Sequence, residues 1–399
     1  MGADDSGALL FHASRGLAQV RRRLGLKLAA TAAALVSLLL IGPAAAAAAT
    51  PYLSTVPRET LPIATTVPSN GDQNPYGIVT VPTSIGLLRQ GDLLVSNFNN
   101  DGANGGQQGT GTTIVQIPPG GARNDPRTAS VFAQIARNAL PGGVGLTTGL
   151  AVTRSGFVFV GDLPTADGTS ATAKAGGILV LNSRGQLIET VSGGPLNGPW
   201  DMTATESGDV TTLYVSNVLN GTVARSPDVV DEGTVLRMQF LTIPDSVPML
   251  LDETVIARGF PERTDPAALV VGPTGLALGG NGTLYVADTQ GNRIAAIPDA
   301  TTRQQPLGDG GVTVSAGHEL MGPLGLTLAP NGDLLAANGG NGNIVEVAPS
   351  GDQVMTVTAD DTSVPGGGGV LFGLTVSPFT NDLYFVDDGM NSLGVFAPR

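Results

Sequence analysis

Two residues have side chains that could exchange protons with a substrate. His318 is the only histidine after His12, and it stands beside Glu319 in "AGHELMGP". An imidazole titrates near neutral pH, so it can serve as an acid or a base. Asp201 occupies a position where the related segments described below have Gly, and a carboxylate there could bind a cation or act as a base. The alternatives are a solvent-exposed His and an Asp that caps a turn. Both residues are kept as catalytic candidates.

The stretch "SNFNNDGANGGQQGTG" is spaced like the start of a calcium loop at Asn97, Asn99, Asp101 and Gly102. Its first two oxygen ligands would be neutral amides, and Gln108 stands where such a loop has a Glu. The sequence therefore predicts no bound cofactor, with a divalent cation such as calcium as the alternative. The candidate ligands for that alternative are Asp201, Asp162, Asp288, Asn97 and Asp101.

Other reactive groups are scarce. The chain has no Cys, which excludes disulfides, thiol nucleophiles and zinc–thiolate sites, and it has no G-x-S-x-G motif. Beyond residue 49 it has one lysine, Lys174. Its adjacent acidic pairs, such as Asp387 and Asp388, would point to opposite faces of a strand, so they make poor acid–base pairs.

Residues 1–49 have the three parts of a secretory signal: the basic "VRRRLGLK", the apolar run Leu28–Ile41, and an alanine-rich end. We expect cleavage near Ala49 and a secreted product, extracellular or periplasmic, exported by the Sec or the twin-arginine route. An uncleaved anchor is the alternative. The remaining chain carries 15 basic and 31 acidic residues, a net charge of −16. Such a charge repels phosphate backbones and anionic lipids, which argues against nucleic-acid and membrane-surface binding.

The rest of the chain repeats one pattern six times: a turn, an apolar strand, a Gly turn, and a second apolar strand that closes with Asn or Asp. A third strand follows each closing residue, and often a fourth. Repeats of roughly 40–50 residues with several short strands are typical of β-propeller blades. The closing residues are Asn97, Asp162, Asn217, Asp288, Asn338 and Asp387.

We therefore predict an all-β fold, a six-bladed β-propeller of four-stranded antiparallel blades in one domain, residues 50–399. The sixth copy ends one strand short, and an orphan strand candidate at 59–67 precedes the first. We expect this N-terminal strand to complete the last blade, because closure removes free sheet edges. The predicted blades are 74–134, 145–193, 198–260, 272–317, 322–360, and 370–399 with 59–67.

The segment "LYVADTQGNRI", with "GPTGLAL" upstream, resembles an NHL-type repeat, and the six copies cover nearly the whole chain after residue 49. Similar propellers include lyases, lactonases and binding scaffolds, so the resemblance implies a fold and no single activity. The gluconolactonase family would imply acidic or Asn residues before Gly in several first strands, where this chain has Tyr76, Thr148, Thr274, Leu324 and Phe372. Streptogramin lyases and copper-dependent amidating lyases would imply several histidines, which this chain lacks.

A binding site is expected at one mouth of the propeller channel. The residues before the first strands and the loops after the closing residues should line this mouth, and the loops 98–111, 163–176 and 218–233 are long. The function predicted is a ligand- or protein-binding scaffold acting through this long-loop face. Its partner is an unidentified protein or a small neutral or cationic ligand, and we expect a monomer. The alternatives are a metal-assisted hydrolase or lyase and a non-catalytic extracellular structural module. The ligand-binding candidates are Tyr76, Trp200, Phe372, Phe98 and Asp167.

Overall fold

The computed structural model describes residues 50–57, 60–100, 106–119, 129–140, 142–360 and 371–396. Thr50–Arg399 form one compact unit. The signal-peptide prediction for residues 1–49, the metal candidate Asp101, and parts of the predicted first and last blades lie outside the described residues. Within the described ranges, no helix is both long and apolar enough to span a membrane.

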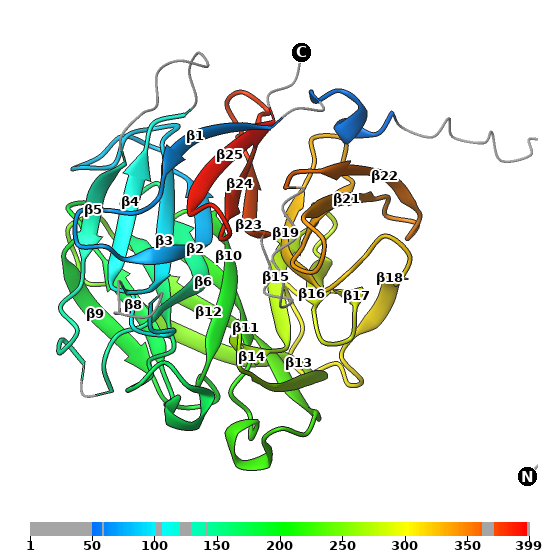
Figure 1. Ribbon diagram of the computed structural model, residues 1–399. Helices are drawn as coiled ribbons and strands as arrows, with labels where there is room; N and C mark the ends of the chain where they lie inside the picture. The colour runs from blue at the N-terminus through cyan, green and yellow to red at the C-terminus, as the bar shows by residue number, and fades with distance from the viewer. Residues whose placement is uncertain are drawn as a thin grey trace, which may run out of the picture. The chain divides into compact units, whose positions relative to one another are not determined.

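The unit is a six-bladed β-propeller, which confirms the predicted fold class. In Figure 1 the first strands of the blades gather near the centre and the last strands lie at the rim. The strands of blades 1 to 3 are, in order, β2 (Gln73–Thr80), β3 (Leu93–Asn99), β4 (Thr113–Ile117) and β5 (Ser130–Gln134); β6 (Leu146–Val152), β7 (Val158–Asp162), β8 (Gly177–Leu181) and β9 (Leu187–Ser192); β10 (Pro199–Ser207), β11 (Val210–Asn217), β12 (Val230–Leu241), β13 (Met249–Asp265) and β14 (Leu269–Val271).

The strands of blades 4 to 6 follow the same order from the centre to the rim. They are β15 (Pro273–Leu278), β16 (Leu284–Asp288), β17 (Arg293–Ile297) and β18 (Val312–Ala316); β19 (Pro323–Leu328), β20 (Leu334–Asn338), β21 (Asn343–Val347) and β22 (Gln353–Thr358); β23 (Leu371–Val376), β24 (Leu383–Asp387), β25 (Ser392–Phe396) and β1 (Leu61–Thr65). The described residues also contain three single-turn 3-10 helices, η1 (Tyr52–Ser54), η2 (Ser170–Thr172) and η3 (Val223–Arg225).

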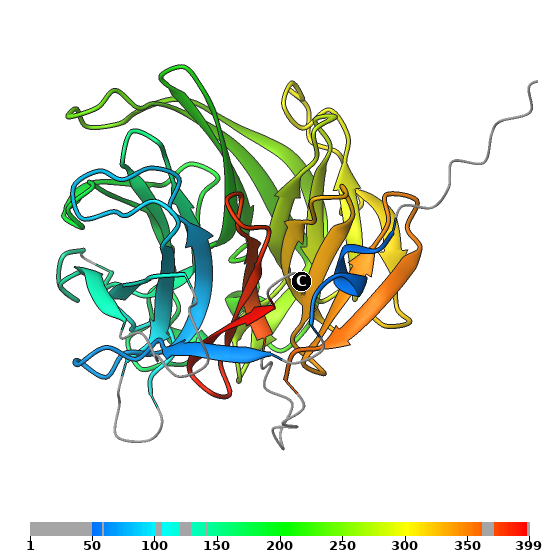
Figure 2. The same cartoon turned by 90° about the horizontal axis from the view of Figure 1, so that it is seen from above.

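The N-terminal strand closes the ring, as predicted. β1 pairs antiparallel with β25, with Leu61 opposite Val395 and Thr65 opposite Ser392. Figure 2 shows the blue β1 lying beside the red strands of the last blade. Pairing the two ends of the propeller in one sheet leaves no incomplete blade between the first and the sixth.

The third blade differs from the prediction of four strands, because it has five. β13 is 17 residues long and turns back through a tight hairpin into β14. Pro261 lies inside β13. A proline cannot donate a ladder hydrogen bond, so in a sequence it usually predicts the end of a strand. It is tolerated here because the β12–β13 register shifts between Glu262 and Phe260, so Pro261 lies at an irregularity where the ladder is interrupted. On the other side, β14 pairs only with residues 263–265.

Every first strand carries a β-bulge at the same place. The register shifts around the Gly of each first strand, or around Asp201 in blade 3, and this position is called the Gly-or-Asp step below. The shift lies, for example, between Pro273 and Leu276 and between Pro199 and Met202. The glycine lets neighbouring first strands approach closely, since a Cβ on Gly275 would lie 2.4 Å from the backbone nitrogen of Leu326. Asp201 is the residue at this step in blade 3, so its side chain must find room where the backbone leaves none in blades 4, 5 and 6.

The hydrophobic core is divided among the seams between blades. Separate clusters of buried Leu, Ile, Val, Ala and Phe fill the seams from blade 1 to blade 6. A further cluster joins blades 6 and 1 and reaches the channel axis, where it includes Tyr76, Phe98, Trp200 and Phe372. Packing between blades therefore holds the first strands rigidly around the axis.

Candidate functional site

Four aromatic rings fill the axis at the start of the first strands. Tyr76 stacks between Phe98, at a ring-centroid distance of 4.5 Å, and Phe372, at 4.0 Å. Trp200 meets Tyr76 and Phe98 edge-on, at 5.8 and 5.7 Å. All four are buried, and none is more than 5% exposed. Four of the five ligand-binding candidates thus lie together as a closely packed group of rings, called the aromatic plug below.

The long loops cover this plug. Leu269, the first residue of β14, is 1% exposed and packs in the same cluster as the rings. Gln108 Nε2 donates to the Pro266 carbonyl at 3.0 Å, and Ser170 Oγ donates to the Leu269 carbonyl at 2.7 Å. Loops from blades 1 and 2 therefore hold the blade 3 hairpin over the axis. The fifth strand, which the sequence did not predict, supplies the cover.

A cavity of about 190 Å³ lies along the axis and is bordered by first strands from all six blades. The residue after each Gly-or-Asp step is large and apolar, which surrounds the cavity with a hydrophobic ring. Half-buried threonine hydroxyls from blades 3, 5 and 6 add polar groups. The apolar ring consists of Ile78, Leu150, Met202, Leu276, Leu326 and Leu374, and the threonines are Thr203, Thr327 and Thr375.

Asp201 is the one ionisable residue that lines this cavity. Its Oδ1 accepts the backbone N–H of Met202 at 2.8 Å, and the backbone N–H of Leu276 in blade 4 also bonds to the carboxyl. The side chain is half-buried, since it borders the cavity while protein surrounds it on the other sides. Desolvation raises the pKa of Asp201 to about 8, although the two N–H groups act in the opposite direction. The neutral form of this carboxyl is therefore favoured at pH 7.

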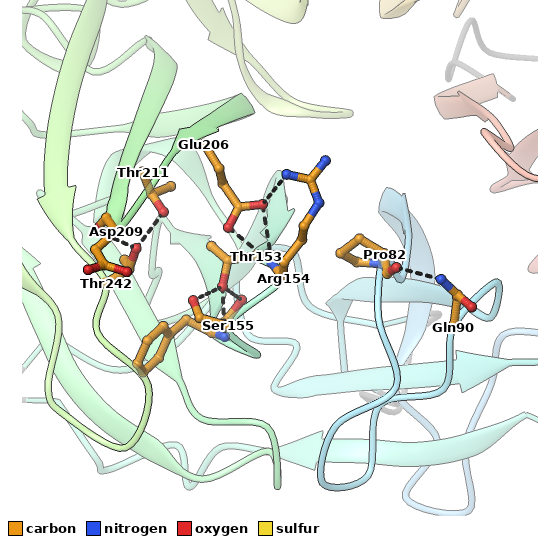
Figure 3. Close-up of polar contacts among 10 residues, drawn as sticks. Pro82, Gln90, Thr153, Arg154, Ser155, Glu206, Asp209, Thr211 and Thr242 are labelled. Carbon is orange, nitrogen blue, oxygen red and sulfur yellow. Dashed lines mark hydrogen bonds and ion pairs between the residues drawn. The ribbon is translucent and has the colours of Figure 1, made fainter.

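A charged pair lies beyond the cavity, formed by Arg154 in the turn after β6 and Glu206 near the end of β10 (Figure 3). The Glu206 carboxylate accepts the backbone N–H of Arg154 at 3.1 and 3.2 Å, and the Arg154 guanidinium lies 3.7 Å from the same carboxylate. Arg154 and Glu206 each follow a cavity-lining residue, Val152 and Ala204, by two positions. This pair ties blades 2 and 3 together on the face opposite the long loops.

The closing Asn and Asp residues bind the backbone of their own blades. Asp162 Oδ1 accepts the Gly145 N–H at 2.7 Å, and Asn217 Oδ1 accepts the Gly198 N–H at 2.8 Å. Asn338 and Asp387 accept N–H groups from Met321 and Met390. The first three contacts fix the chain just before the first strands of blades 2, 3 and 5, and the fourth fixes the turn after β24. Burial raises the pKa of Asp162 to about 7 and that of Asp387 to about 6, which follows from desolvation of both carboxyls.

The remaining candidates are dispersed. Asp288 is fully buried and bonded to Arg293, and Asn97 donates to the Thr66 carbonyl. His318 is exposed in a turn after β18, with a positive φ of 55°. Asp167 is exposed and accepts bonds from Thr169 and Thr172 within its own loop, which lowers its pKa. Across the described residues, no three His, Asp or Glu side chains gather closely enough to hold a metal ion.

Sequence reasoning singled out Asp201 because it breaks the Gly pattern, but it missed the threonines of the cavity. Thr203, Thr327 and Thr375 stand two positions after the Gly-or-Asp step of their blades. That regular spacing was available in the sequence. It carried no signal by itself, because threonine is common in strands for reasons of backbone shape.

Comparisons with known proteins support the fold. Neither the family models nor the curated proteins give a match to this sequence. Among solved structures, a calcium-binding regucalcin from Agrobacterium tumefaciens is 13% identical with a TM-score of 0.50, and the match covers 85% of this chain and 96% of that one. A gluconolactonase from Xanthomonas campestris is 15% identical with a TM-score of 0.48, covering 85% and 89%. An inactive variant of virginiamycin B lyase from Staphylococcus aureus is 16% identical with a TM-score of 0.45, covering 85% and 88%. Identities this low speak only for a shared propeller fold.

Proposed function

We propose that the protein is an exported binding scaffold that takes a small organic cation into the axial channel, with Asp201 as the counter-ion. The observation that carries this proposal is the lone carboxyl inside an otherwise apolar and hydroxyl-lined cavity. The cavity, at about 190 Å³, is smaller than the ~300–1,000 Å³ of sites for drug-sized molecules. The ligand class is therefore a short amine with an apolar body.

The composition of the lining favours an organic cation over a metal ion. Calcium needs about six to eight oxygen ligands, several of them from carboxylates. The cavity offers one carboxyl and three hydroxyls beside six large apolar side chains. An alkylammonium needs fewer oxygens, and its carbon chain gains from contact with the apolar ring.

The channel is a better candidate than the long-loop face. On that face the aromatic side chains are covered, and the loops bond to one another through Gln108 and Ser170. A protein partner that binds the outer surface of these loops would be consistent with a scaffold, but the four buried rings themselves line none of the three cavities bordered by Asp201, Asp72 and Asp245. Export through the segment 1–49 is part of the same proposal.

The test uses n-propylammonium and its uncharged near-isostere 1-propanol as probes. We expect millimolar n-propylammonium to raise the unfolding midpoint more than 1-propanol does, because a ligand that binds only the folded protein stabilises it. Asp201→Asn should remove that difference. Asp245→Asn is the matched control, since Asp245 is exposed, does not line the channel and undergoes the same chemical substitution.

The pH dependence gives a second criterion. Binding a cation requires the carboxylate form of Asp201, so the affinity for n-propylammonium should rise about tenfold per pH unit until the pH passes the pKa of the group, near 8. An affinity that is flat between pH 6 and 8, or an equal response in Asp201→Asn, would contradict the proposal.

A metal-assisted hydrolase or lyase is the second candidate, because a carboxyl with a pKa near 8 could act as a base. It would need calcium, magnesium or zinc to raise the unfolding midpoint of the wild-type protein and not of Asp201→Asn. A purely structural module would respond to neither the metals nor n-propylammonium.

A further inference from the structure

The segment that precedes the closing strand is itself bound to the propeller. Residues 50–57 lie against blades 5 and 6, and Tyr52, Leu53 and Val56 are at most 6% exposed. They pack in one cluster with buried side chains such as Leu335 and Phe385. The Tyr52 hydroxyl donates to the Asn381 carbonyl at 2.6 Å. Residues 50–57 therefore have a defined binding position on the propeller, called the seat below.

Glu346 of β21 holds the backbone of the segment. Its Oε1 accepts the Tyr52 N–H at 2.6 Å, and its Oε2 accepts the Leu53 N–H at 2.7 Å. Glu346 is fully buried, so these charge-assisted bonds offset the loss of its hydration. The carboxylate fixes the direction of the chain just after residue 50.

A second carboxyl stands beside Glu346 at the place where Thr50 enters. Asn331 Nδ2 lies 3.0 Å from Asp333 Oδ2, 2.9 Å from Glu346 Oε1 and 3.3 Å from the Thr50 carbonyl oxygen. One amide nitrogen thus touches both carboxyls and the backbone of Thr50. Among the ion pairs of the described residues, none gives Asp333 or Glu346 a basic partner. Desolvation, and then the hydrogen bond and charge of Glu346, raise the pKa of Asp333, so a nearby cation would favour the ionised form of this pair.

We propose that hydrolysis of the Ala49–Thr50 bond by a leader peptidase produces a Thr50 α-ammonium that pairs with Asp333 and Glu346. This rests on the proposed export. In the reaction the Ala49 carbonyl carbon gains the oxygen of water, the C–N bond breaks, and the Thr50 nitrogen takes up the protons. The new ammonium supplies a positive charge beside the two carboxyls.

The covalent geometry brings that charge within reach. The nitrogen of a residue lies no more than about 3.6 Å from its own carbonyl oxygen. The Thr50 carbonyl oxygen already shares the Asn331 amide with both carboxyls. A rotation about the backbone of Thr50, which is exposed, brings its amine toward them. In the unprocessed chain the same nitrogen is a neutral amide and offers no charge.

The processed chain allows a direct test, because it would contain two amines: the Thr50 α-amine and Lys174. The full chain is expressed with its own leader in an exporting bacterium, and the exported protein is purified and its intact mass measured. It is then treated with limiting acetyl N-hydroxysuccinimide ester at pH 7.5. Peptide mapping gives the acetylation rate of the α-amine relative to Lys174 in the same molecule.

We expect the mature protein to begin at Thr50. The pairing raises the pKa of the α-amine above its ordinary ~7.7–8.0, and each unit lowers the reactive free-amine fraction about tenfold. In Asp333→Asn the ratio of α-amine to Lys174 acetylation should rise by about three- to tenfold. In the matched control Asp352→Asn, an exposed acid of the same blade, it should stay at the wild-type value.

Two results would overturn the inference. A mature protein that begins at any other residue refutes the cleavage site, and an Asp333→Asn ratio equal to wild type in a folded protein refutes the pairing. Far-UV circular dichroism and the unfolding midpoint verify that the variants fold. Neither result affects binding of n-propylammonium at Asp201, and a chain that is not exported at all refutes export instead.

Discussion

The backbone N–H of Leu276 in blade 4 bonds to the carboxyl of Asp201 in blade 3. In the blade 4 to blade 5 seam the corresponding step is Gly275, which leaves no room for a side chain. The third blade thus replaces a close backbone contact with a carboxyl that reaches across the seam. This exchange puts the one acid of the channel where neighbouring first strands meet.

Stability should fall as the pH rises from 5 to 9. Burial raises the pKa of Asp162 to about 7 and those of Asp201 and Glu262 to about 8, well above their values in an unfolded chain. The folded state therefore holds more protons in this window, and stability is lost as these groups ionise. The unfolding midpoint of Asp201→Asn should decline less with pH than that of the wild type. Asp167→Asn is the control, because the pKa of Asp167 is lowered and the group stays ionised throughout. Parallel curves for wild type and Asp201→Asn would refute this.

Removing the partner of Asp288 should cost much of the stability of blade 4. Arg293 Nε donates to Asp288 Oδ2 at 2.8 Å, and Arg293 also bonds to Thr313 and to the Gly310 carbonyl. Arg293→Met leaves a fully buried carboxyl without its cation, which costs ~3–5 kcal/mol in comparable cases. Urea unfolding measures the loss. Adding Asp288→Asn should recover part of it.

The matched control is Arg154→Met, because the Arg154 guanidinium is 73% exposed in its pair with Glu206. Exposed pairs contribute only ~0–1 kcal/mol. Equal losses for the two arginine variants would show that burial of the Asp288 pair is not decisive.

The closing strand should be as important as any interior strand. Ile63 of β1 is 7% exposed and packs in the cluster that reaches the axis. Ile63→Ala should lower the free energy of unfolding by ~2–5 kcal/mol, the usual cost of truncating a buried Ile. Val131→Ala is the control, since Val131 lies in the outer strand β5 and is 45% exposed. A loss for Ile63→Ala no larger than for Val131→Ala would mean that β1 adds little.

The fluorescence of Trp200 should show how well the hairpin shields the aromatic plug from solvent. It is 1% exposed, and it is the only Trp, so acrylamide should quench its fluorescence poorly in the wild type. Leu269→Ala shortens the side chain that packs in the same cluster, and it should increase the Stern–Volmer constant. Leu87→Ala, on a residue that is 49% exposed, should leave the constant unchanged. Quenching that does not respond to Leu269→Ala would show that other groups shield the indole.

Most of the architecture could be predicted from the repeated sequence pattern. A Gly turn followed by an apolar strand with a closing Asn or Asp occurs six times, and each copy forms the first two strands of one blade. Ring closure followed from counting strands. The fifth strand of blade 3 did not follow, because Pro261 interrupts its β13 neighbour and residues 269–271 are too few to show alternation.

The site was harder to predict, since its properties depend on distant contacts. Asp201 stands out in the sequence, but neither its cavity nor its raised pKa can be read from its neighbours along the chain. Glu346 looks like an outward residue of an alternating strand in "NIVEV", yet it is fully buried because residues 52 and 53 cover it. The aromatic residues lie buried together, and the hairpin that helps to bury them was not predicted.

The antiparallel pairing of β1 with β25 has a mechanical consequence. Leu61 begins β1 and lies opposite Val395 near the end of β25, so both flanking segments leave from the same end of the ladder. A force that pulls these segments apart would load the hydrogen bonds one after another, as in unzipping, and not all at once in shear. A force on the N-terminal segment would load the hydrogen bonds from Tyr52 and Leu53 to Glu346 before it loads those of the β1–β25 ladder.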